Sequence, residues 1–376
     1  MALTDCRGNA TLPPLKRLAC VLLPRTGEPE PRRDSSLPQS HAAVAVIGCG
    51  AIARAAHVPA LAKHPEVRNR LVLVDRDLDR ANALAREFGI ARTAADYRDA
   101  LPAVQGAVIA LPHHLHFPVA LDCLRAGVHV LCEKPLAGSA AEAAQLVAAS
   151  EQAGVALAVN QARRLFPPSE AAHRLVQEGA IGTLRFIGYY DGAKYDWPTA
   201  SGFAFGLQGG GKGVLLDIGA HVLDLICWWL GHQPRVTDYV DDSVGGSEAV
   251  AKVALLDGTA RGEVHLSWLA KLENGFRIEG DVGTIIGNLY DWETLQLASP
   301  SGRRKSISLK TRVRSIKDIS SLVVENFLGV VEKREAPLVP GRDVVPSIAL
   351  IEECYARRRR FNMPWQDDLE PIRYAT

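Results

Sequence analysis

Residues 43–53 read Ala-Val-Ala-Val-Ile-Gly-Cys-Gly-Ala-Ile-Ala, and this stretch decides the fold of the chain. The five apolar residues that end at Ile47 predict a short buried β-strand, because an apolar run that stops at glycine is typical of one. Gly48 permits a tight turn, Gly50 lets a ligand approach the backbone, and the small Ala53 lets the next helix pack closely on the strand. The pattern predicts a dinucleotide-binding loop whose helix offers backbone N–H groups to a pyrophosphate.

The nucleotide site extends from this loop to the end of the second predicted strand. The loop residues expected to contact the cofactor are Gly48, Gly50, Ala51 and Ile52. Asp75 ends the second strand, 25 residues after Gly50, where a carboxylate accepts hydrogen bonds from the adenosine ribose. The charge of Asp75 favours NAD because it repels a 2′-phosphate, whereas Arg76 can accommodate that phosphate, so NADP is the alternative cofactor.

Strands and helices alternate from residue 43 to about residue 163. Several amphipathic segments end at a glycine (Gly89, Gly127, Gly154), which is typical of a helix C-cap. Such alternation with short loops predicts a doubly wound parallel sheet with helices on both faces. The expected helices cover residues 52–63, 78–88, 118–126 and 139–153, and the later strands cover 71–74, 107–110, 129–132 and 155–159.

A second pattern begins after Arg163. Strand-like runs separated by turn residues such as Asp257-Gly258 predict an open, mostly antiparallel sheet, with long helices against one face. The expected strands cover residues 184–191, 249–256, 260–268, 275–279, 284–289 and 294–297, and the expected helices cover 215–230, 320–333 and 344–360. The fold class expected for the whole chain is α/β plus α+β.

These patterns divide the chain into three parts. Residues 1–42 contain six prolines and no helical or strand period, so an irregular or disordered extension is expected. Residues 43–163 are expected to form a Rossmann domain and residues 164–376 a substrate-binding domain, whose final helix can pack back on the first domain. The open face of the antiparallel sheet must be hydrated or paired, so we expect a homodimer or homotetramer formed through it.

The composition narrows the classes of partner. The 43 basic and 42 acidic residues give a net charge of +1, so no overall field attracts nucleic acid or a membrane. The run Arg357–Arg360 is the local exception and is expected on a solvated helix face. Seven cysteines without a C-x-x-C pair indicate neither a zinc site nor a disulfide framework, and the apolar run Leu18–Leu23 is too short for a signal peptide or a membrane span. A cytoplasmic, metal-free protein is expected.

Two loops at the carboxyl ends of strands should face the cofactor, because ligands of open parallel sheets bind there. The first loop contains Pro112 and three histidines within four residues, and the last of them, His116, is expected to contact the nicotinamide half or to cap structure. The spacing of these histidines does not suit a metal site. The second loop contains Glu133 and Lys134 before Pro135, and both a cofactor contact and a surface ion pair fit that pair when it is considered alone.

The segment from residue 209 to residue 224 carries candidate acid–base groups. Asp217 and His221 are four residues apart on a predicted helix, so their side chains share one face. A histidine with a carboxylate one turn away is a reasonable acid–base unit, because the pKa of imidazole lies near neutral pH. A capping aspartate and a buried structural histidine fit the same spacing, and the spacing alone favours this second interpretation.

These motifs together resemble the Gfo/Idh/MocA family, which is named for glucose–fructose oxidoreductase, inositol dehydrogenase and a rhizopine-catabolism protein. The similarity extends from about Ala43 to Trp365. It rests on the glycine loop, the stretch Ala126–Leu136, the segment Asn160–Arg164, Gly179-x-Ile181-Gly182, and Asp217-x-Gly219-x-His221-x-x-Asp224. Several independent motifs in the same order make the resemblance specific.

The resemblance implies hydride transfer at a nicotinamide and a catalytic set of Lys134, Asp217 and His221. In this arrangement Lys134 would hydrogen-bond the reacting hydroxyl and the cofactor ribose. Asp217 would bind and orient the substrate, and His221 would exchange the alcohol proton. Arg164 and Lys194 are further candidates for substrate contact.

The expected function is that of an NAD(P)-dependent dehydrogenase, which oxidises one secondary hydroxyl of a sugar, glycoside or cyclitol. An NADPH-dependent reductase of keto-sugars or aldehydes and a non-catalytic NAD(P)-sensing regulator stay open as alternatives. Alanine- and arginine-rich usage suggests a GC-rich bacterial genome, in which related enzymes often modify sugars of secondary metabolites. Lys212 departs from the family because it interrupts a usually unbroken glycine run, and with residues 195–198 it is expected to shape the substrate pocket.

Overall fold

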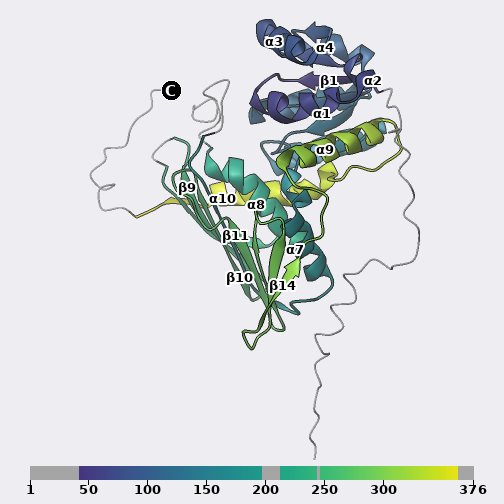
Figure 1. Cartoon of the computed structure of the whole chain (residues 1–376). Coiled ribbons are helices and arrows are strands. Elements are labelled where there is room, and N and C mark those ends of the chain that lie inside the picture. Colours follow the sequence, from purple (N-terminus) through teal and green to yellow (C-terminus); the bar gives the residue numbers. More distant parts are fainter. Residues whose placement is uncertain (1–41, 197–211, 244–245, 363–376) are drawn as a thin grey trace, which may run out of the picture. The chain divides into compact units, whose positions relative to one another are not determined.

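The computed structural model of the chain describes residues 42–196, 212–243 and 246–362 (Figure 1). The predicted irregular extension lies outside the described residues except for Ala42, and so do residues 197–198 and 209–211. The described residues form a parallel sheet of six strands and a mostly antiparallel sheet of nine. The predicted α/β plus α+β fold is confirmed.

The six-stranded sheet has the order β3-β2-β1-β4-β5-β6, and all its pairs are parallel. Its strands are β1 (Val44–Ile47), β2 (Val72–Val74), β3 (Arg92–Ala94), β4 (Gly106–Ile109), β5 (His129–Cys132) and β6 (Leu157–Val159). The strand order reverses between β1 and β4, which leaves a crevice at the carboxyl ends of the strands. The short β3 escaped sequence prediction because its residues are exposed or only half-buried and show no apolar run.

Helices in this half begin and end where local residues satisfy their backbone groups. The side chains of Asp77 and Ser139 accept hydrogen bonds from N–H groups in the first turns of α3 and α6, and Gly89 and Gly154 end these helices in the left-handed conformation. The helices are α1 (Val58–Ala62), α2 (Pro65–Arg68), α3 (Leu78–Phe88), α4 (Tyr97–Ala100), α5 (His116–Arg125) and α6 (Ala140–Ala153), and a π-helical turn, η2 (Ala53–His57), leads into α1.

The nine-stranded sheet has the order β14-β13-β12-β11-β7-β10-β9-β8-β15. The pairs β7–β10 and β8–β15 are parallel and the other pairs are antiparallel. The predicted turn at Asp257-Gly258 joins β9 to β10, with Gly258 at a positive φ. The strands are β7 (Leu184–Gly192), β8 (Arg235–Asp241), β9 (Val250–Asp257), β10 (Ala260–Ser267), β11 (Gly275–Gly280), β12 (Thr284–Asn288), β13 (Thr294–Ala298), β14 (Arg304–Ser308) and β15 (Arg358–Arg360).

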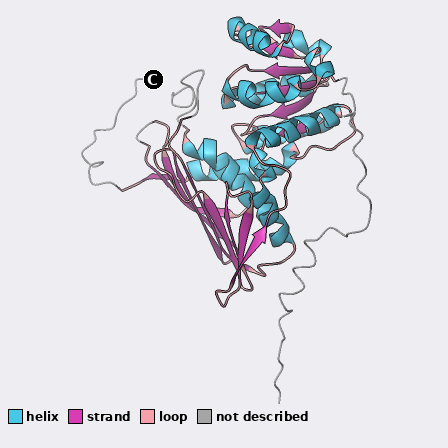
Figure 2. Cartoon of the chain, in the orientation of Figure 1, coloured by secondary structure: helices cyan, strands magenta, loops and turns pink. Residues whose placement is uncertain are grey.

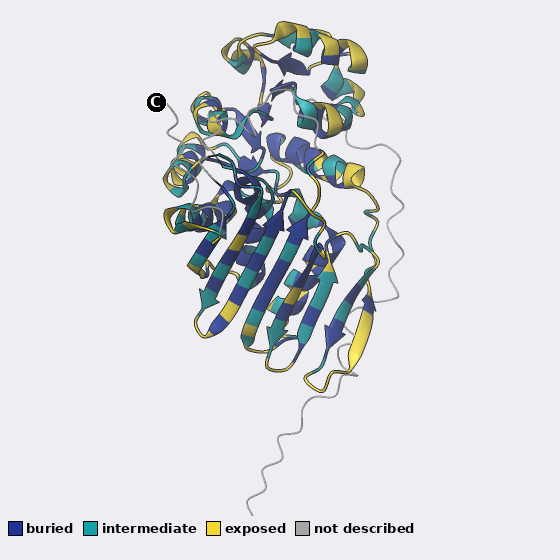
Figure 3. Ribbon diagram, turned by 90° about the vertical axis from the view of Figure 1, so that its left-hand side faces the viewer, coloured by how far each residue is buried: buried dark blue, intermediate teal, exposed yellow. Residues whose placement is uncertain are grey.

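Helices α7 (Pro167–Gln177) and α8 (Val214–Leu230) cover one face of this sheet (Figure 2). Tyr189 of β7 points to that face, where its ring stacks near Trp229 of α8. The neighbouring Tyr190 points to the opposite face, which carries half-buried side chains and has no described helix in front of it (Figure 3). The alternation explains why period-two patterns identified these strands.

Two late helices contact elements of the first half of the chain. Helix α9 (Ile316–Val331) lies against η2 and α1, and a Cβ at Gly106 of β4 would lie 2.8 Å from a methyl carbon of Val331. Helix α10 (Val345–Ala356) packs on both α8 and α6. The domain boundary at residue 163 stays a prediction. One hydrophobic core contains buried residues from both sides of this boundary.

The C-terminal arginines correct one expectation. The helix predicted over 344–360 ends at Ala356, and Arg358–Arg360 form β15 beside β8. Arg358 is not on a solvated helix face, because its guanidinium binds the buried carboxylates of Asp241 and Glu248. Two buried carboxylates require a counter-charge, and Arg358 of β15 provides it.

Candidate active site

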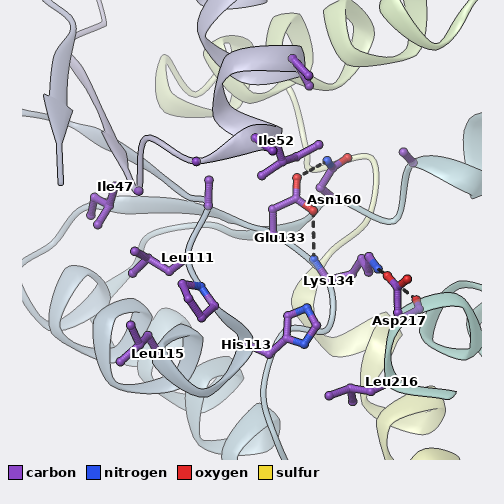
Figure 4. Close-up of a pocket in the computed structure, with 18 of the residues that line it drawn as sticks. Ile47, Ile52, Leu111, His113, Leu115, Glu133, Lys134, Asn160, Leu216 and Asp217 are labelled. Atoms are coloured by element: carbon purple, nitrogen blue, oxygen red, sulfur yellow. Dashed lines mark hydrogen bonds and ion pairs between the residues drawn. The ribbon is translucent and has the colours of Figure 1, made fainter. Parts of the chain in front are cut away.

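A cleft of about 1490 Å³ opens at the carboxyl ends of β1, β2, β4 and β5 and is bounded by the start of α8 (Figure 4). Most of the predicted site residues line it: Gly48, Gly50, Ala51, Ile52, Asp75, Arg76, Pro112, Glu133, Lys134, Lys194, Asp217 and His221. Among the described residues, no group of three or more His, Cys, Asp or Glu side chains could hold a metal ion. No helix within the described ranges is long and apolar enough to cross a membrane.

The two glycines of the loop play different parts. The N–H of Gly48 donates to the carbonyl of Val74, its φ is +97°, and a Cβ there would lie 2.4 Å from the carbonyl oxygen of Ala110. A Cβ at Gly50 would meet nothing within 4 Å. Gly48 is therefore required by the fold, whereas Gly50 leaves open space on the cleft side of the loop.

Asp75 is held by the protein on several sides. Its carboxylate accepts hydrogen bonds from the backbone N–H groups of Cys49, at 3.0 Å, and Asp77, at 2.9 Å. Arg80 also donates to it at 3.2 Å, and both Arg76 and Arg80 line the cleft. The negative charge of Asp75, which was expected to repel a 2′-phosphate, is thus partly balanced by Arg80, and the sequence did not predict this partner.

Glu133 is a buried anchor rather than a surface partner of Lys134. Its Oε1 lies 2.7 Å from His57 Nε2 and accepts a hydrogen bond from the amide of Asn160, also at 2.7 Å. Burial is the largest effect and opposes its ionisation, but His57, Asn160 and Lys134 together outweigh it and lower the pKa of Glu133. The Oδ1 atom of Asn160 is buried at the cleft without a hydrogen-bond partner among the described residues.

Lys134 and Asp217 meet across the cleft (Figure 4). The Nζ of Lys134 donates to Asp217 Oδ1 at 2.7 Å and to the backbone carbonyl of Asp217 at 3.0 Å. The other carboxylate oxygen accepts from the indole N–H of Trp268 at 3.2 Å. Burial raises the pKa of Asp217, but Lys134 together with His113 and Arg163 offsets this and holds the pKa below its usual value.

His221 is oriented by an amide rather than by Asp217. Its Nδ1 lies 3.0 Å from Oε1 of Gln161, whose Nε2 donates to the carbonyl of Ala220 at 3.1 Å. Because a carbonyl can only accept, the Gln161 amide must present its oxygen to His221, and Nδ1 of His221 must carry the proton. Burial, with Lys134 and Arg163 nearby, lowers the pKa of His221 well below 6.5. The ring is neutral, and its Nε2 is an acceptor. The expected Asp217–His221 unit is wrong in this respect.

Two predicted site residues lie away from the cleft. Arg164 is buried and forms a two-point ion pair with Asp224 of α8 at 2.7 Å, so its guanidinium is already occupied by a carboxylate. His116 is fully buried, with one ring nitrogen 2.7 Å from the carbonyl of Pro135 and the other 2.8 Å from that of Leu111. Neither lines the cleft, so the expected substrate contact of Arg164 and nicotinamide contact of His116 are not supported.

Sequence reasoning missed several residues that complete the site. His113, three residues before His116, lines the cleft, and burial lowers its pKa to about 3, with His116 and Lys134 acting in the same direction. Asn160 and Gln161 directly follow β6 at the carboxyl edge of the sheet, and this position was the available signal for them. Trp268 follows β10 and had no signal in the sequence.

The cleft fits a nicotinamide dinucleotide. The open space at Gly50 accepts a pyrophosphate against the N–H groups that begin the η2–α1 helix. Asp75 and Arg76 lie where an adenosine ribose would bind, and the unsatisfied Oδ1 of Asn160 is suited to a donor such as a carboxamide or a ribose hydroxyl.

These features define the class of protein: an NAD(P)-dependent oxidoreductase with a Rossmann domain. A family model described as an oxidoreductase family with an NAD-binding Rossmann fold matches residues 42–161, and the GFO/IDH/MocA C-terminal domain model matches residues 169–286. The chain belongs to the Gfo/Idh/MocA family, as the sequence resemblance predicted.

Three relatives illustrate the similarity. The chain is 29% identical over 227 residues to 1,5-anhydro-D-fructose reductase of Ensifer adhaerens, an alignment that covers 57% of this chain and 67% of the relative. It is 31% identical over 236 residues to trans-1,2-dihydrobenzene-1,2-diol dehydrogenase of Mus musculus, covering 59% and 68%. A levoglucosan dehydrogenase solved with NADH and levoglucosan shares the fold, with a TM-score of 0.71, 22% identity and coverage of 84% of this chain and 97% of that one.

Proposed function

We propose that this chain oxidises a secondary hydroxyl of a sugar, glycoside or cyclitol, with NAD(P) as the hydride acceptor. The observation that carries the proposal is the meeting of Lys134, from the dinucleotide half, with Asp217 at the start of α8, on the same cleft wall as His221. Relatives named as a reductase of 1,5-anhydro-D-fructose and a dehydrogenase of levoglucosan support a sugar-like substrate.

Each of the three side chains has one task in the proposed reaction. A bound nicotinamide supplies the chemistry of hydride transfer to or from the substrate carbon. The ammonium of Lys134 donates a hydrogen bond to the substrate oxygen, and Asp217 holds that ammonium in place. Nε2 of the neutral His221 accepts the hydroxyl proton as the alcohol becomes a ketone.

The free protein presents His221 in the protonation state that the oxidation direction requires. Its lowered pKa leaves the ring able to accept a proton near neutrality, and the reduction would use the same ring after it has taken up a proton. Aromatic side chains Tyr195, Trp268 and Tyr290 line the substrate side of the cleft, and such walls with a few convergent polar groups suit a small hydroxylated ligand.

The proposal also covers the preferred cofactor, the oligomeric state and the location of the protein. NAD remains the first choice because Asp75 faces the ribose position, and Arg76 and Arg80 make NADP the alternative. The open face of the nine-stranded sheet supports a homodimer or homotetramer, and strand alternation places half-buried aromatic side chains such as Phe186 and Tyr190 on it. Cytoplasmic location and the lack of a nucleic-acid partner stay predictions.

The proposal is tested by following absorbance at 340 nm with NAD or NADP and a panel of sugars, glycosides and cyclitols. The wild-type protein should reduce the cofactor with at least one alcohol, while Lys134→Ala and His221→Ala should abolish turnover and still bind dinucleotide. A protein that binds dinucleotide but turns over no alcohol or ketone would support the regulator alternative. Faster turnover of ketones with NADPH at neutral pH would support the reductase.

A further inference from the structure

Helix α8, which carries Asp217 and His221, begins without a cap of its own. Its N-cap residue is Gly213, which has no side chain to accept from the first turn. The backbone N–H groups of Gly213 and Leu215 instead donate to Oε1 of Glu248, at 2.9 and 3.1 Å, and that of Val214 donates to the backbone carbonyl of Glu248 at 2.9 Å. One distant residue thus satisfies three donors at the start of the helix.

The contact between Gly213 and Glu248 is close enough to fix both segments. A Cβ at Gly213 would lie 2.0 Å from the carbonyl oxygen of Glu248 and 2.8 Å from its backbone nitrogen. Any side chain at this position would push the two backbones apart. The φ of Gly213 is negative, so the glycine is required by the close approach of the two backbones and not by a left-handed conformation.

Glu248 is itself held by the C-terminal part of the chain. The hydroxyl of Tyr355 donates to its Oε1 at 2.8 Å, and the guanidinium of Arg358 donates to its Oε2 at 3.0 Å. Arg358 also donates to Asp241 at 2.5 Å, and both carboxylates are fully buried. The C-terminal strand β15 therefore supplies the counter-charge that lets a buried glutamate cap the helix.

The capped turn leads directly to the site. The N–H of Asp217 donates to the carbonyl of Gly213 at 3.0 Å, in the first turn of α8, and its carboxylate binds Lys134 and Trp268. A shift of Gly213 is therefore passed to the carboxylate that orients the Lys134 ammonium.

We propose that Glu248, with Arg358 as its counter-charge, is a positioning residue that sets the first turn of α8 and so places Asp217 beside Lys134. Its effect on turnover rests on the function proposed above. Its effect on the placement of Asp217 does not, because the indole N–H of Trp268 reports that placement directly through its bond to Asp217.

The experiment records indole ¹H–¹⁵N resonances of the six tryptophans in the full chain, with Trp268 assigned by Trp268→Phe, together with kcat, KM and the Kd of NADH. Glu248→Ala should move the Trp268 resonance and lower kcat by about 10²-fold, the order expected for a displaced catalytic group, while the Kd of NADH stays the same. Glu248→Gln keeps an acceptor oxygen for the helix and should restore the resonance and most of kcat.

A matched control is Glu353→Gln, because Glu353 accepts from Val236 N–H and Arg357 and has no hydrogen bond or ion pair with α8 within the described part of the chain. It should leave the resonance and kcat unchanged. If Glu248→Ala does not fold, Arg358→Met takes its place and should also move the resonance. An unmoved resonance and unchanged kcat in the folded variant would overturn the proposal, even if its Tm falls. A wild type without any turnover rejects the proposed function instead and leaves the resonance as the test of positioning.

Discussion

The dinucleotide half and the substrate half of the cleft hold their polar groups in different ways. In the dinucleotide half, the bonds around Gly48 and Asp75 join residues at most 26 positions apart, within one strand–loop–helix–strand unit. In the substrate half, Lys134 and Asp217 are 83 positions apart, and His221 and Gln161 are 60 apart. One half is a local motif, and the other exists only when distant segments have packed.

This difference predicts how each half responds to mutation. A local loop can lose ligand binding while the rest of the fold is retained, since its shape depends on few residues. A site built from distant contacts loses geometry first, so its variants should affect kcat more than cofactor affinity.

The largest effect is expected where the halves join. Lys134→Met removes the ammonium that binds Asp217 and should lower kcat by about 10³-fold, within the range for loss of a positioned acid–base or electrostatic group. Dinucleotide binding, measured by NADH fluorescence, should change much less. Lys63→Met is the control, because Lys63 donates to the hydroxyl of Ser321 and does not line the cleft. A variant that keeps half of wild-type kcat would remove Lys134 from the catalytic set.

The second largest loss of kcat is expected for variants that change the orientation of His221. Gln161→Leu removes the acceptor that fixes the proton on Nδ1 and should lower kcat by about 10²-fold. Gln161→Glu should act differently, because a carboxylate stabilises the imidazolium and raises the pKa of His221. A base works only when unprotonated, so the acid limb of kcat/KM for oxidation should lie well below pH 6.5 in the wild type and move to higher pH in Gln161→Glu. If the acid limb of kcat/KM is the same in Gln161→Glu and the wild type, a group other than His221 accepts the proton.

A pair of loop variants should separate folding from binding in the local half. Gly50→Ala places a methyl group in open space and should keep the Tm, but raise the Kd for NAD(P) by about thirtyfold if that space is filled by the ligand, equivalent to about 2 kcal/mol. Gly48→Ala places one 2.4 Å from a carbonyl oxygen and should lower the Tm itself. Thermal melts and isothermal titration distinguish the two, and equal behaviour of both variants would contradict this division of roles.

The smallest effect is expected at Trp268. Trp268→Phe keeps most of the ring and removes the N–H that donates to Asp217, and should lower kcat by about tenfold, equivalent to about 1.4 kcal/mol. Lys134 still holds the other carboxylate oxygen, which limits the loss. A Trp228→Phe variant is the matched control, since its ring stacks on His173 outside the cleft. Equal kcat values for the two variants would show that the indole bond does not matter.

The sequence identified the parts of the site whose roles depend on residues close together along the chain. The glycine loop, the carboxyl-edge positions of Glu133 and Lys134, and the helix with Asp217 and His221 could all be located, and the structure brings them to one cleft. Family motifs added the grouping of Lys134 with Asp217, which spacing alone did not provide.

Partners chosen by packing could not be predicted. Arg164 was a substrate candidate until its bond to Asp224 was seen, and Arg358 was assigned to a helix although it binds Asp241, 117 positions away. Strand β14 escaped because four of its five residues are exposed, which hides the alternation that marks a half-buried strand.

The packing of α9 against η2 and α1 restricts how this chain can be recombined with its relatives. Residues 316–331 follow eight strands of the nine-stranded sheet in sequence, yet α9 lies beside α1 (Figure 1), and a Cβ at Gly106 of the parallel sheet would lie within 3.2 Å of Phe327 and Val331. A chimera joined near residue 163 would pair one parent's nucleotide sheet with the other parent's helix at a surface that tolerates no extra methyl group. Exchange of substrate preference between family members should therefore keep α9 and the nucleotide sheet from the same parent, which needs three junctions, near residue 163, before residue 316 and after residue 331, where a simple chimera needs one.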